Sequence, residues 1–337
     1  YLYDDKNLES LIQNIWSVGY NVIANCNNLV QNISKEDTVK FEEKRLERDM
    51  IHGEALACRG FMHFELLRYF APSLSEAGDK VYMPYFDEFP SLMASYLSVP
   101  GMIEKIERDL LDARDILATT DTLKEMLYLL PTTCRYEGQQ GPSDMFFNYR
   151  GFRMNYTAVT AALARLYFYA NRLEEAAKMA TEVIDFVDDR GEKIFSFTSK
   201  EEFSNKTKMY DELIFALSQR KLTENFENYD ESDDNACNLA VDYWDWEEWK
   251  SEDAGDKRLA EDGGLVRVVL GIWEYVFTRK YYDATGMNEI NKRMIPVMRL
   301  SEMYYIRGEY YASLGDFGKA VAELEVVRNA SCLLYTS

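Results

Sequence analysis

Apolar side chains recur at helical spacing through residues 296–330, in two stripes separated by a short break. The stripes consist of Met298, Leu300, Met303, Tyr304, Ile306, Tyr310, Tyr311 and Leu314, then Ala320, Val321, Leu324 and Val327. A period of 3.6 residues predicts two helices. Gly315 lies in the break, where a residue in the left-handed conformation ends many helices. The stretch therefore predicts a helical hairpin whose first helix starts near Pro296.

Residues 154–184 repeat this pattern. Their large and small apolar positions are filled by Leu163, Ala164, Tyr167, Ala176, Ala180 and Val183. Asn171 stands at the turn, as Gly315 does in the other hairpin, and asparagine tolerates the same conformation. The alternation of large and small residues is typical of tetratricopeptide repeats. Gly308 and Ala320 take the small positions in the C-terminal hairpin, where they would let two helices approach closely.

Three further amphipathic helices are predicted closer to the N-terminus. They cover residues 8–33, about 41–70, and 102–117. Gly60 is a point of close approach in the second of them. Asp109 and Asp112 are expected on the polar side of the third helix.

The segments between the helices lack this period. Residues 73–100 contain three prolines, and residues 131–151 combine glycines with aromatic residues. Residues 213–217 are continuously apolar and predict a buried strand, and residues 265–282 predict one or two more strands.

These elements predict a mostly α-helical protein, with a single domain over residues 1–337. It consists of tetratricopeptide-like helical hairpins with a few short strands. The helical scaffold is expected mainly at residues 8–72, 101–187 and 294–330. A loop-rich insertion is expected at about residues 188–293.

The formal net charge of −20 argues against nucleic acid and against an anionic membrane surface as partners. It is neutral toward uncharged ligands such as sugars, and solubility is its simplest explanation. The five cysteines show no C-x-x-C spacing, and the chain has 2 histidines, so no metal site and no cofactor are predicted.

No catalytic constellation is visible. His52 and His63 lie on one predicted helix without a serine or cysteine motif, and we interpret them as surface or core-edge residues. Carboxylate pairs are too frequent in so acidic a chain to indicate a glycosidase. The oxygen ligands of Asp230, Asp233, Asp234 and Asn235 could hold calcium, but the spacing favours a solvated acidic loop. We therefore predict that the protein is not an enzyme.

The most distinctive candidate site is the aromatic cluster Tyr243, Trp244, Trp246 and Trp249, which lies among carboxylates. Aromatic faces bind the apolar faces of sugar rings, and the carboxylates could bond hydroxyl groups. The alternative is that Trp246 and Trp249, three residues apart, pack one helical face into the core. Tyr82 and Tyr85 in the long loop are second-rank candidates for binding.

Four stretches resemble motifs of the SusD/RagB family, the surface lipoproteins with which Bacteroidetes take up glycans. The first is residues 54–70, a predicted helix that contains Arg59 and ends before a proline-bearing loop, and the third is the alanine-rich stretch 157–184. The second, residues 106–113, reads Ile-Glu-Arg-Asp-Leu-Leu-Asp-Ala and is similar to an I-x-x-D-L-x-x-A helix of the family. The fourth, residues 295–304, reads Ile-Pro-Val-Met-Arg-Leu-Ser-Glu-Met-Tyr and is similar to an I-P-V-x-R-x-x-E helix. The last motif is the most specific. The resemblance spans roughly residues 8–330.

The resemblance implies a SusD-like fold and a non-catalytic protein that binds an oligo- or polysaccharide at the cell outer membrane, as a surface-exposed lipoprotein. It also implies a partner, a SusC-like TonB-dependent transporter that receives the glycan. Family members have a lipidated N-terminal cysteine and continue past the fourth repeat. We therefore expect a fragment truncated at both ends, which would meet the membrane only through a missing lipid anchor. The alternative is a tetratricopeptide scaffold that binds a peptide or protein partner, but the long insertions argue against it.

Overall fold

The computed structural model is mostly helical with a few short strands, which confirms the predicted fold class. The chain divides into two compact units, Tyr1–Tyr128 with Met154–Val183, and Leu129–Arg153 with Ile184–Ser337. We call these the first and the second unit, and the single-domain organisation stays a prediction. The residues that the structure describes are 6–138, 145–203, 206, 208–225, 241–252, 255–256, 258–259, 264–270, 273–278 and 289–331.

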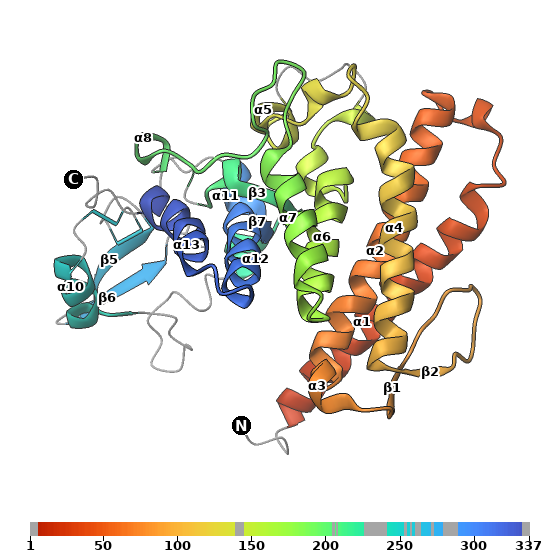
Figure 1. Ribbon diagram of the computed structural model, residues 1–337, viewed down its shortest axis with the longest axis horizontal. Coiled ribbons are helices and arrows are strands. Elements are labelled where there is room, and N and C mark those ends of the chain that lie inside the picture. Colours follow the sequence, from red (N-terminus) through yellow and green to blue (C-terminus); the bar gives the residue numbers. More distant parts are fainter. Residues whose placement is uncertain are drawn as a thin grey trace. The chain divides into compact units, whose positions relative to one another are not determined.

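Long helices form the first unit, at the positions that the sequence predicts. α1 (Lys6–Ile33) and α4 (Val99–Asp121) both contact α2 (Lys44–Phe70), and α6 (Tyr156–Tyr169) packs against α4 (Figure 1). The start of α4 follows from local chemistry: the Ser98 side chain accepts a hydrogen bond from the backbone of the first turn.

Glycine sets the distance between α2 and α4. A Cβ atom added to Gly60 would lie 3.1 Å from Cβ of Asp109, and one added to Gly53 would lie 2.7 Å from Cγ of Leu117. Side chains at these positions would push the helices apart. The close approach predicted at Gly60 is therefore confirmed.

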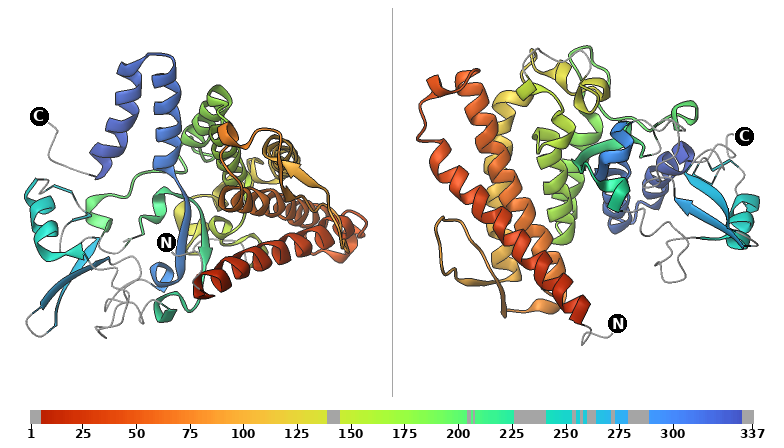
Figure 2. Two further views of the ribbon diagram at one scale, coloured as in Figure 1. Left: turned by 90° about the horizontal axis from the view of Figure 1, so that it is seen from below. Right: turned by 180° about the vertical axis from the view of Figure 1, so that it is seen from behind.

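The predicted loop of residues 73–100 is partly ordered into short elements. It contains α3 (Leu74–Ala77) and the antiparallel strands β1 (Val81–Pro84) and β2 (Tyr96–Ser98). In the right-hand view of Figure 2, the connection between the two strands is a wide loop. The Tyr20 hydroxyl of α1 donates to the carbonyl oxygen of Pro84 at 3.0 Å and so ties this loop to the helices.

In the second unit, the predicted strand is found as β3 (Leu213–Ser218), which pairs antiparallel with β7 (Met294–Arg299). This pairing corrects one expectation, because the first helix of the C-terminal hairpin does not start near Pro296. Residues 294–299 are five consecutive apolar residues and an arginine that pair with β3, and the helix begins only where the strand ends.

The C-terminal hairpin consists of α12 (Leu300–Ser313) and α13 (Phe317–Ser331). Gly315 has φ 76° between them and Asn171 has φ 58° in the other hairpin, as predicted for left-handed turn residues. A Cβ atom added to Gly308 would lie 3.6 Å from the carbonyl oxygen of Ala320, which places both residues where α12 and α13 approach each other.

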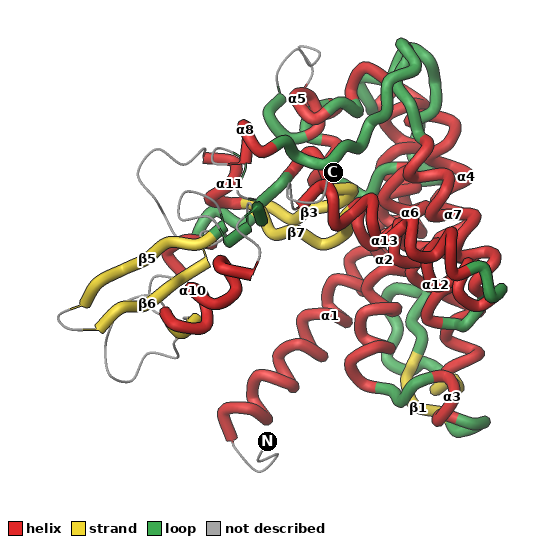
Figure 3. The backbone as a smooth tube through the Cα atoms, turned by 60° about the vertical axis from the view of Figure 1, so that its left-hand side comes forward, coloured by secondary structure: helices red, strands yellow, loops and turns green. Residues whose placement is uncertain are grey.

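A second sheet lies in the region where one or two strands are predicted. β5 (Leu265–Leu270) and β4 (Val241–Asp242) flank β6 (Trp273–Thr278) in an antiparallel sheet. α10 (Tyr243–Glu252) contacts β4 and β6, and Figure 3 shows it beside β6. The remaining elements are α5 (Thr132–Arg135), α7 (Leu173–Asp185), α8 (Lys200–Phe203), α11 (Glu289–Arg293) and the 3-10 turns η1 (Thr38–Lys40), η2 (Leu127–Leu129), η3 (Met145–Phe147), η4 (Arg150–Phe152) and η5 (Tyr210–Glu212).

In the described part of the chain, no helix combines the length and the apolar composition that crossing a membrane requires.

Candidate ligand-binding surfaces

The predicted aromatic cluster lies on α10, which follows β4 directly. Asp242 ends the strand and begins the helix, because its Oδ1 accepts a hydrogen bond from the backbone N–H of Trp244 at 2.8 Å. The four aromatic residues therefore have fixed positions around a single short helix, and their exposure depends on which side of that helix faces the sheet.

Trp246 faces inward and is 1% exposed. Its indole Nε1 donates to the carbonyl oxygen of Leu259 at 2.9 Å, and the ammonium group of Lys250 lies 4.4 Å from its ring centroid. The Tyr243 ring meets it edge-on at 5.8 Å. The core-packing interpretation thus describes Trp246, whose ring faces are covered by the protein.

Trp244 and Trp249 face outward and are 76% and 44% exposed. This is the opposite of core packing for Trp249. Glu248 is one turn from Trp244, and Asp245 is one turn from Trp249, so each exposed indole has an exposed carboxylate as its neighbour on the helix surface. The outer surface of α10 therefore combines flat apolar faces with hydrogen-bond acceptors.

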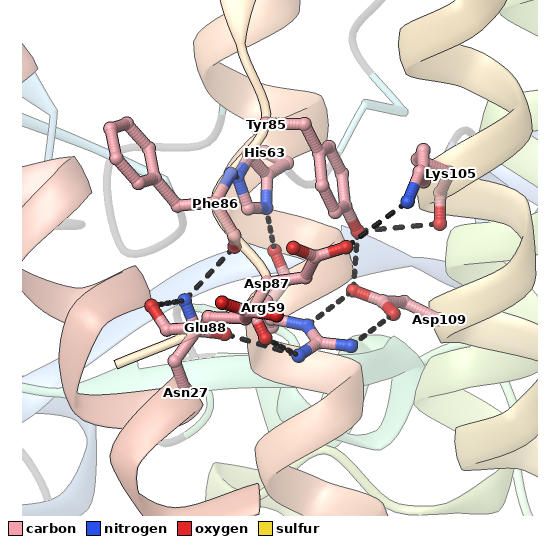
Figure 4. Close-up of polar contacts among 9 residues, drawn as sticks. All are labelled: Asn27, Arg59, His63, Tyr85, Phe86, Asp87, Glu88, Lys105 and Asp109. Atoms are coloured by element: carbon pink, nitrogen blue, oxygen red, sulfur yellow. Dashed lines mark hydrogen bonds and ion pairs between the residues drawn. The ribbon is translucent and has the colours of Figure 1, made fainter. Parts of the chain in front are cut away.

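Tyr82 and Tyr85 are held by the first unit. The Tyr82 hydroxyl donates to the carbonyl oxygen of Ala77 at 3.0 Å, and its side chain is half-buried. Tyr85 is 6% exposed, and its ring stacks on His63 with centroids 3.9 Å apart (Figure 4). Because its faces are covered, Tyr85 is a packing residue, and Trp244 and Trp249 are the candidates with accessible aromatic faces.

The hydroxyl of Tyr85 reaches a buried ion pair that the sequence analysis missed. Arg59 of α2 donates to both carboxylate oxygens of Asp109 of α4, with Nε–Oδ2 at 2.7 Å and Nη2–Oδ1 at 2.5 Å, and Tyr85 donates to the same Oδ2. Arg59 Nη1 also donates to Oδ1 of Asn27 at 3.1 Å (Figure 4). The expectation that Asp109 lies on the polar side of its helix is therefore wrong, whereas Asp112 is exposed as expected.

His63 completes the network as a neutral side chain. The backbone N–H of Phe86 donates to Nε2 at 3.2 Å, so the ring proton resides on Nδ1, 3.0 Å from the carbonyl oxygen of Arg59. Burial lowers the pKa of His63 to about 3, because a charged imidazole would lose its water and face an N–H donor. His63 is fully buried, which corrects its interpretation as a surface or core-edge residue.

This network is a structural contact within the first unit. Its polar atoms join α1, α2, α4 and the loop after β1, and they are occupied by one another (Figure 4). Arg59 and Asp109 stand in two of the stretches that resemble the SusD/RagB motifs. The sequence alone does not show that Arg59 is buried, and helical periodicity places Asp109 at the surface, so the pair could not be predicted.

No group of three or more His, Cys, Asp or Glu side chains with a metal-binding arrangement occurs among the described residues. The possible calcium ligands Asp230, Asp233, Asp234 and Asn235 lie outside the described residues.

Comparison with known proteins finds a family match in the N-terminal part of the chain. Residues 2–133 match a SusD-like family model with the description "Starch-binding associating with outer membrane". No curated protein matches the chain.

Solved structures extend the likeness over nearly the whole chain. A SusD superfamily protein from Bacteroides thetaiotaomicron matches with a TM-score of 0.68 and 21% identity, covering 94% of this chain and 66% of that one. A SusD-like carbohydrate binding protein from Bacteroides vulgatus matches with a TM-score of 0.64 and 19% identity, covering 94% and 61%. A laminarin binding SusD-like protein matches with a TM-score of 0.56 and 15% identity, covering 94% and 70%.

At these identities the likeness establishes the fold. The chain spans between 61% and 66% of the length of the first three solved structures that it matches. The family-model match over residues 2–133 and the SusD-like fold agree with the resemblance that the sequence motifs indicate.

Proposed function

We propose that the protein binds glycans without transforming them, and that the exposed tryptophans of α10 contact the sugar. The SusD-like fold supports a glycan as the ligand, since the matching family is described as starch-binding and one matching structure binds laminarin. The single observation that carries the site is the outward position of Trp244 and Trp249 on a helix whose third tryptophan is buried.

Physical chemistry favours stacking as the source of affinity. An indole face covers the apolar C–H face of a pyranose ring, while the exposed carboxylates of Asp245 and Glu248 can accept hydrogen bonds from hydroxyl groups. The buried Trp246 and the Asp242 cap fix the helix that presents these groups. Such preorganisation lowers the entropy that the protein loses when it binds.

A role in uptake is the finer part of the proposal. The protein would hold the glycan at the outer membrane and deliver it to a SusC-like TonB-dependent transporter. The family description, which includes association with the outer membrane, supports this location. Co-purification of the full-length protein with the transporter encoded beside it would test the partnership, and a gene neighbourhood without such a transporter would count against it.

A tetratricopeptide scaffold for a peptide or protein partner is the second candidate. The two helical hairpins favour it, but regular repeats leave no place for α10 and the sheet of β4, β5 and β6. Binding of a peptide library without any glycan binding would favour this candidate.

The test of the site compares Trp244→Ala and Trp249→Ala with the parent protein by isothermal titration calorimetry, using maltooligosaccharides and laminarin oligosaccharides as probes. A desolvated tryptophan contact contributes on the order of 2 kcal/mol, so at least one variant should lose affinity roughly thirtyfold at an unchanged melting temperature. Tyr69→Ala, which removes another exposed aromatic side chain, is the control and should bind normally. Normal binding by both tryptophan variants would refute α10 as the site.

A further inference from the structure

The second unit contains a cavity of about 360 Å³ with an apolar floor. Tyr136, Phe152 and Ile290 form this floor. Phe152 meets Tyr136 edge-on at 5.1 Å, and the Tyr136 hydroxyl is occupied as a donor to the carbonyl oxygen of Leu213 at 3.0 Å. The floor belongs to a buried cluster that includes Leu213 of β3, so it is a fixed surface.

The rim of the cavity is polar. It is formed by Glu137, Tyr149, Ser218, Arg220, Glu289 and Arg293. These residues come from segments that are far apart in the sequence and meet at the paired ends of β3 and β7, where the backbone N–H of Gln219 donates to the carbonyl oxygen of Arg293 at 2.7 Å. An apolar floor with a few convergent polar groups is typical of small-molecule sites, and the volume falls in their range of roughly 300–1,000 Å³.

Tyr149 provides a ring at this rim that is held in place. It precedes η4 in the left-handed conformation, with φ 59°. A Cβ atom added to Gly138 would lie 2.7 Å from Cζ of Tyr149, so glycine at position 138 leaves the space that the ring occupies. The side chain is 38% exposed, which leaves part of the ring accessible to a ligand.

The charges of the rim are unequally matched. Glu137 accepts a hydrogen bond from the Tyr210 hydroxyl at 3.0 Å. Glu289 lies 3.0 Å from the ammonium group of Lys292 and 3.5 Å from the guanidinium of Arg293. Arg220 is exposed and forms no ion pair within the described part of the chain. The rim therefore presents a guanidinium whose charge is available to a ligand, beside a second arginine.

We propose that this cavity binds a sugar ring that carries a carboxylate, a uronic acid residue of a glycan, with Arg220 as the partner of the carboxylate and Tyr149 as the stacking surface. Guanidinium groups bind carboxylates through paired, charge-assisted hydrogen bonds. The apolar floor covers the C–H face of the ring. The net charge of −20 repels anionic ligands, and the positive charge of Arg220 would offset this repulsion at the cavity. This inference rests on the proposed function, but it concerns a site separate from α10.

The test uses two matched probes, a uronic acid oligosaccharide and its carboxyl-reduced, neutral counterpart. Both are titrated into the parent protein by calorimetry. Since a hydrogen bond to a charged group is stronger than one between neutral groups, we expect the uronic acid probe to bind at least about tenfold more tightly. Equal affinity for the two probes, or no binding of the uronic acid probe, would overturn the proposal.

Two variants separate the roles. Arg220→Gln should lower the affinity for the uronic acid probe about tenfold and leave that for the neutral probe unchanged. Tyr149→Asn removes the ring but introduces a residue that tolerates the left-handed conformation, and it should lower the affinity for both probes. Arg45→Gln removes the same charge from an exposed arginine that does not line the cavity and should change neither affinity. An effect of Arg45→Gln equal to that of Arg220→Gln would show a general charge effect and overturn the proposal.

The same titrations distinguish this inference from the proposed function. If neutral glycans bind through Trp244 or Trp249 while the uronic acid probe binds no better than its reduced form, the inference fails and the function stands. If the uronic acid probe requires Arg220 and no glycan responds to the tryptophan variants, the inference stands and α10 fails as a site.

Discussion

The ion pair of Arg59 and Asp109 offers a sharp test of what holds the first unit together. Both side chains are nearly buried, at 10% and 7% exposure, and both oxygens of the carboxylate are bonded to the guanidinium. We consider three variants: Arg59→Met, Asp109→Leu and the double substitution. Each single change leaves one charge buried without its partner, whereas the double change removes both charges.

The expected magnitudes follow from the burial. Removing one partner of a buried ion pair costs about 3–5 kcal/mol, because the remaining charge has lost both its water and its counterion. The Asp109→Leu variant also removes the acceptor of the Tyr85 hydroxyl. Replacing the whole pair with apolar residues is often close to neutral. The double variant should therefore be more stable than either single variant, with a coupling energy of at least about 2 kcal/mol.

Urea denaturation followed by circular dichroism measures these differences, and thermal melting provides a second measurement. At about 2–4 °C per kcal/mol for a cooperative unit of roughly 150–250 residues, each single variant should melt roughly 6–20 °C below the parent. Arg45→Met is the matched control, since Arg45 pairs with Asp49 at the surface and should contribute less than about 1 kcal/mol. Losses below about 1 kcal/mol in the single variants, or a double variant that loses the sum of both, would refute the reasoning.

Two further predictions concern stability. Below about pH 6.5 the unfolded chain binds a proton at His63, whereas the folded chain takes up this proton only near pH 3, because burial lowers the pKa of the imidazole to about 3. The contribution of His63 should therefore lower the free energy of unfolding by about 2 kcal/mol between pH 7 and pH 5. Urea titrations at both pH values should show a smaller fall for His63→Gln, and an equal fall would contradict the prediction. Ala320→Leu should overfill the contact of α12 and α13 and cost about 1–3 kcal/mol. An unchanged melting temperature for this variant would count against the packing, and Val326→Leu at an exposed position of α13 is its control.

The helices could be predicted from the sequence because a helix is recognised by signals within its own segment, the period of its apolar residues and the residues that end it. Gly315 and Asn171 are examples, since a left-handed residue after an apolar stripe ends a helix whatever packs against it. Residues 294–299 show where this reasoning stops. Pro296 suits the first turn of a helix, but the partner strand β3, about 80 residues earlier, makes the segment a strand.

The candidate site was less predictable, because its residues are defined by what packs against them. Trp246 and Trp249 are three residues apart and would share a helical face, yet the first is buried and the second is exposed. Trp246 contacts the backbone carbonyl of Leu259 and the ring of Tyr243, and helical spacing contains no information about either contact. Similarly, the helical period of α4 places Asp109 on a polar face, but α2 covers this face and Arg59 pairs with the carboxylate. Gly60 permits this close approach of α2.

The contrast between buried and exposed positions also separates the roles of the aromatic residues. Tyr85 and Trp246 each use their polar atom for a hydrogen bond inside the protein, to Asp109 and to the carbonyl oxygen of Leu259. An aromatic side chain that satisfies its polar atom internally is positioned as a packing residue, because burial then leaves no hydrogen bond unmade. The indoles of Trp244 and Trp249, by contrast, leave much of their apolar surface in water in the unbound protein. A ligand that covers them would remove that apolar surface from water, and this is the physical reason to look for the glycan there.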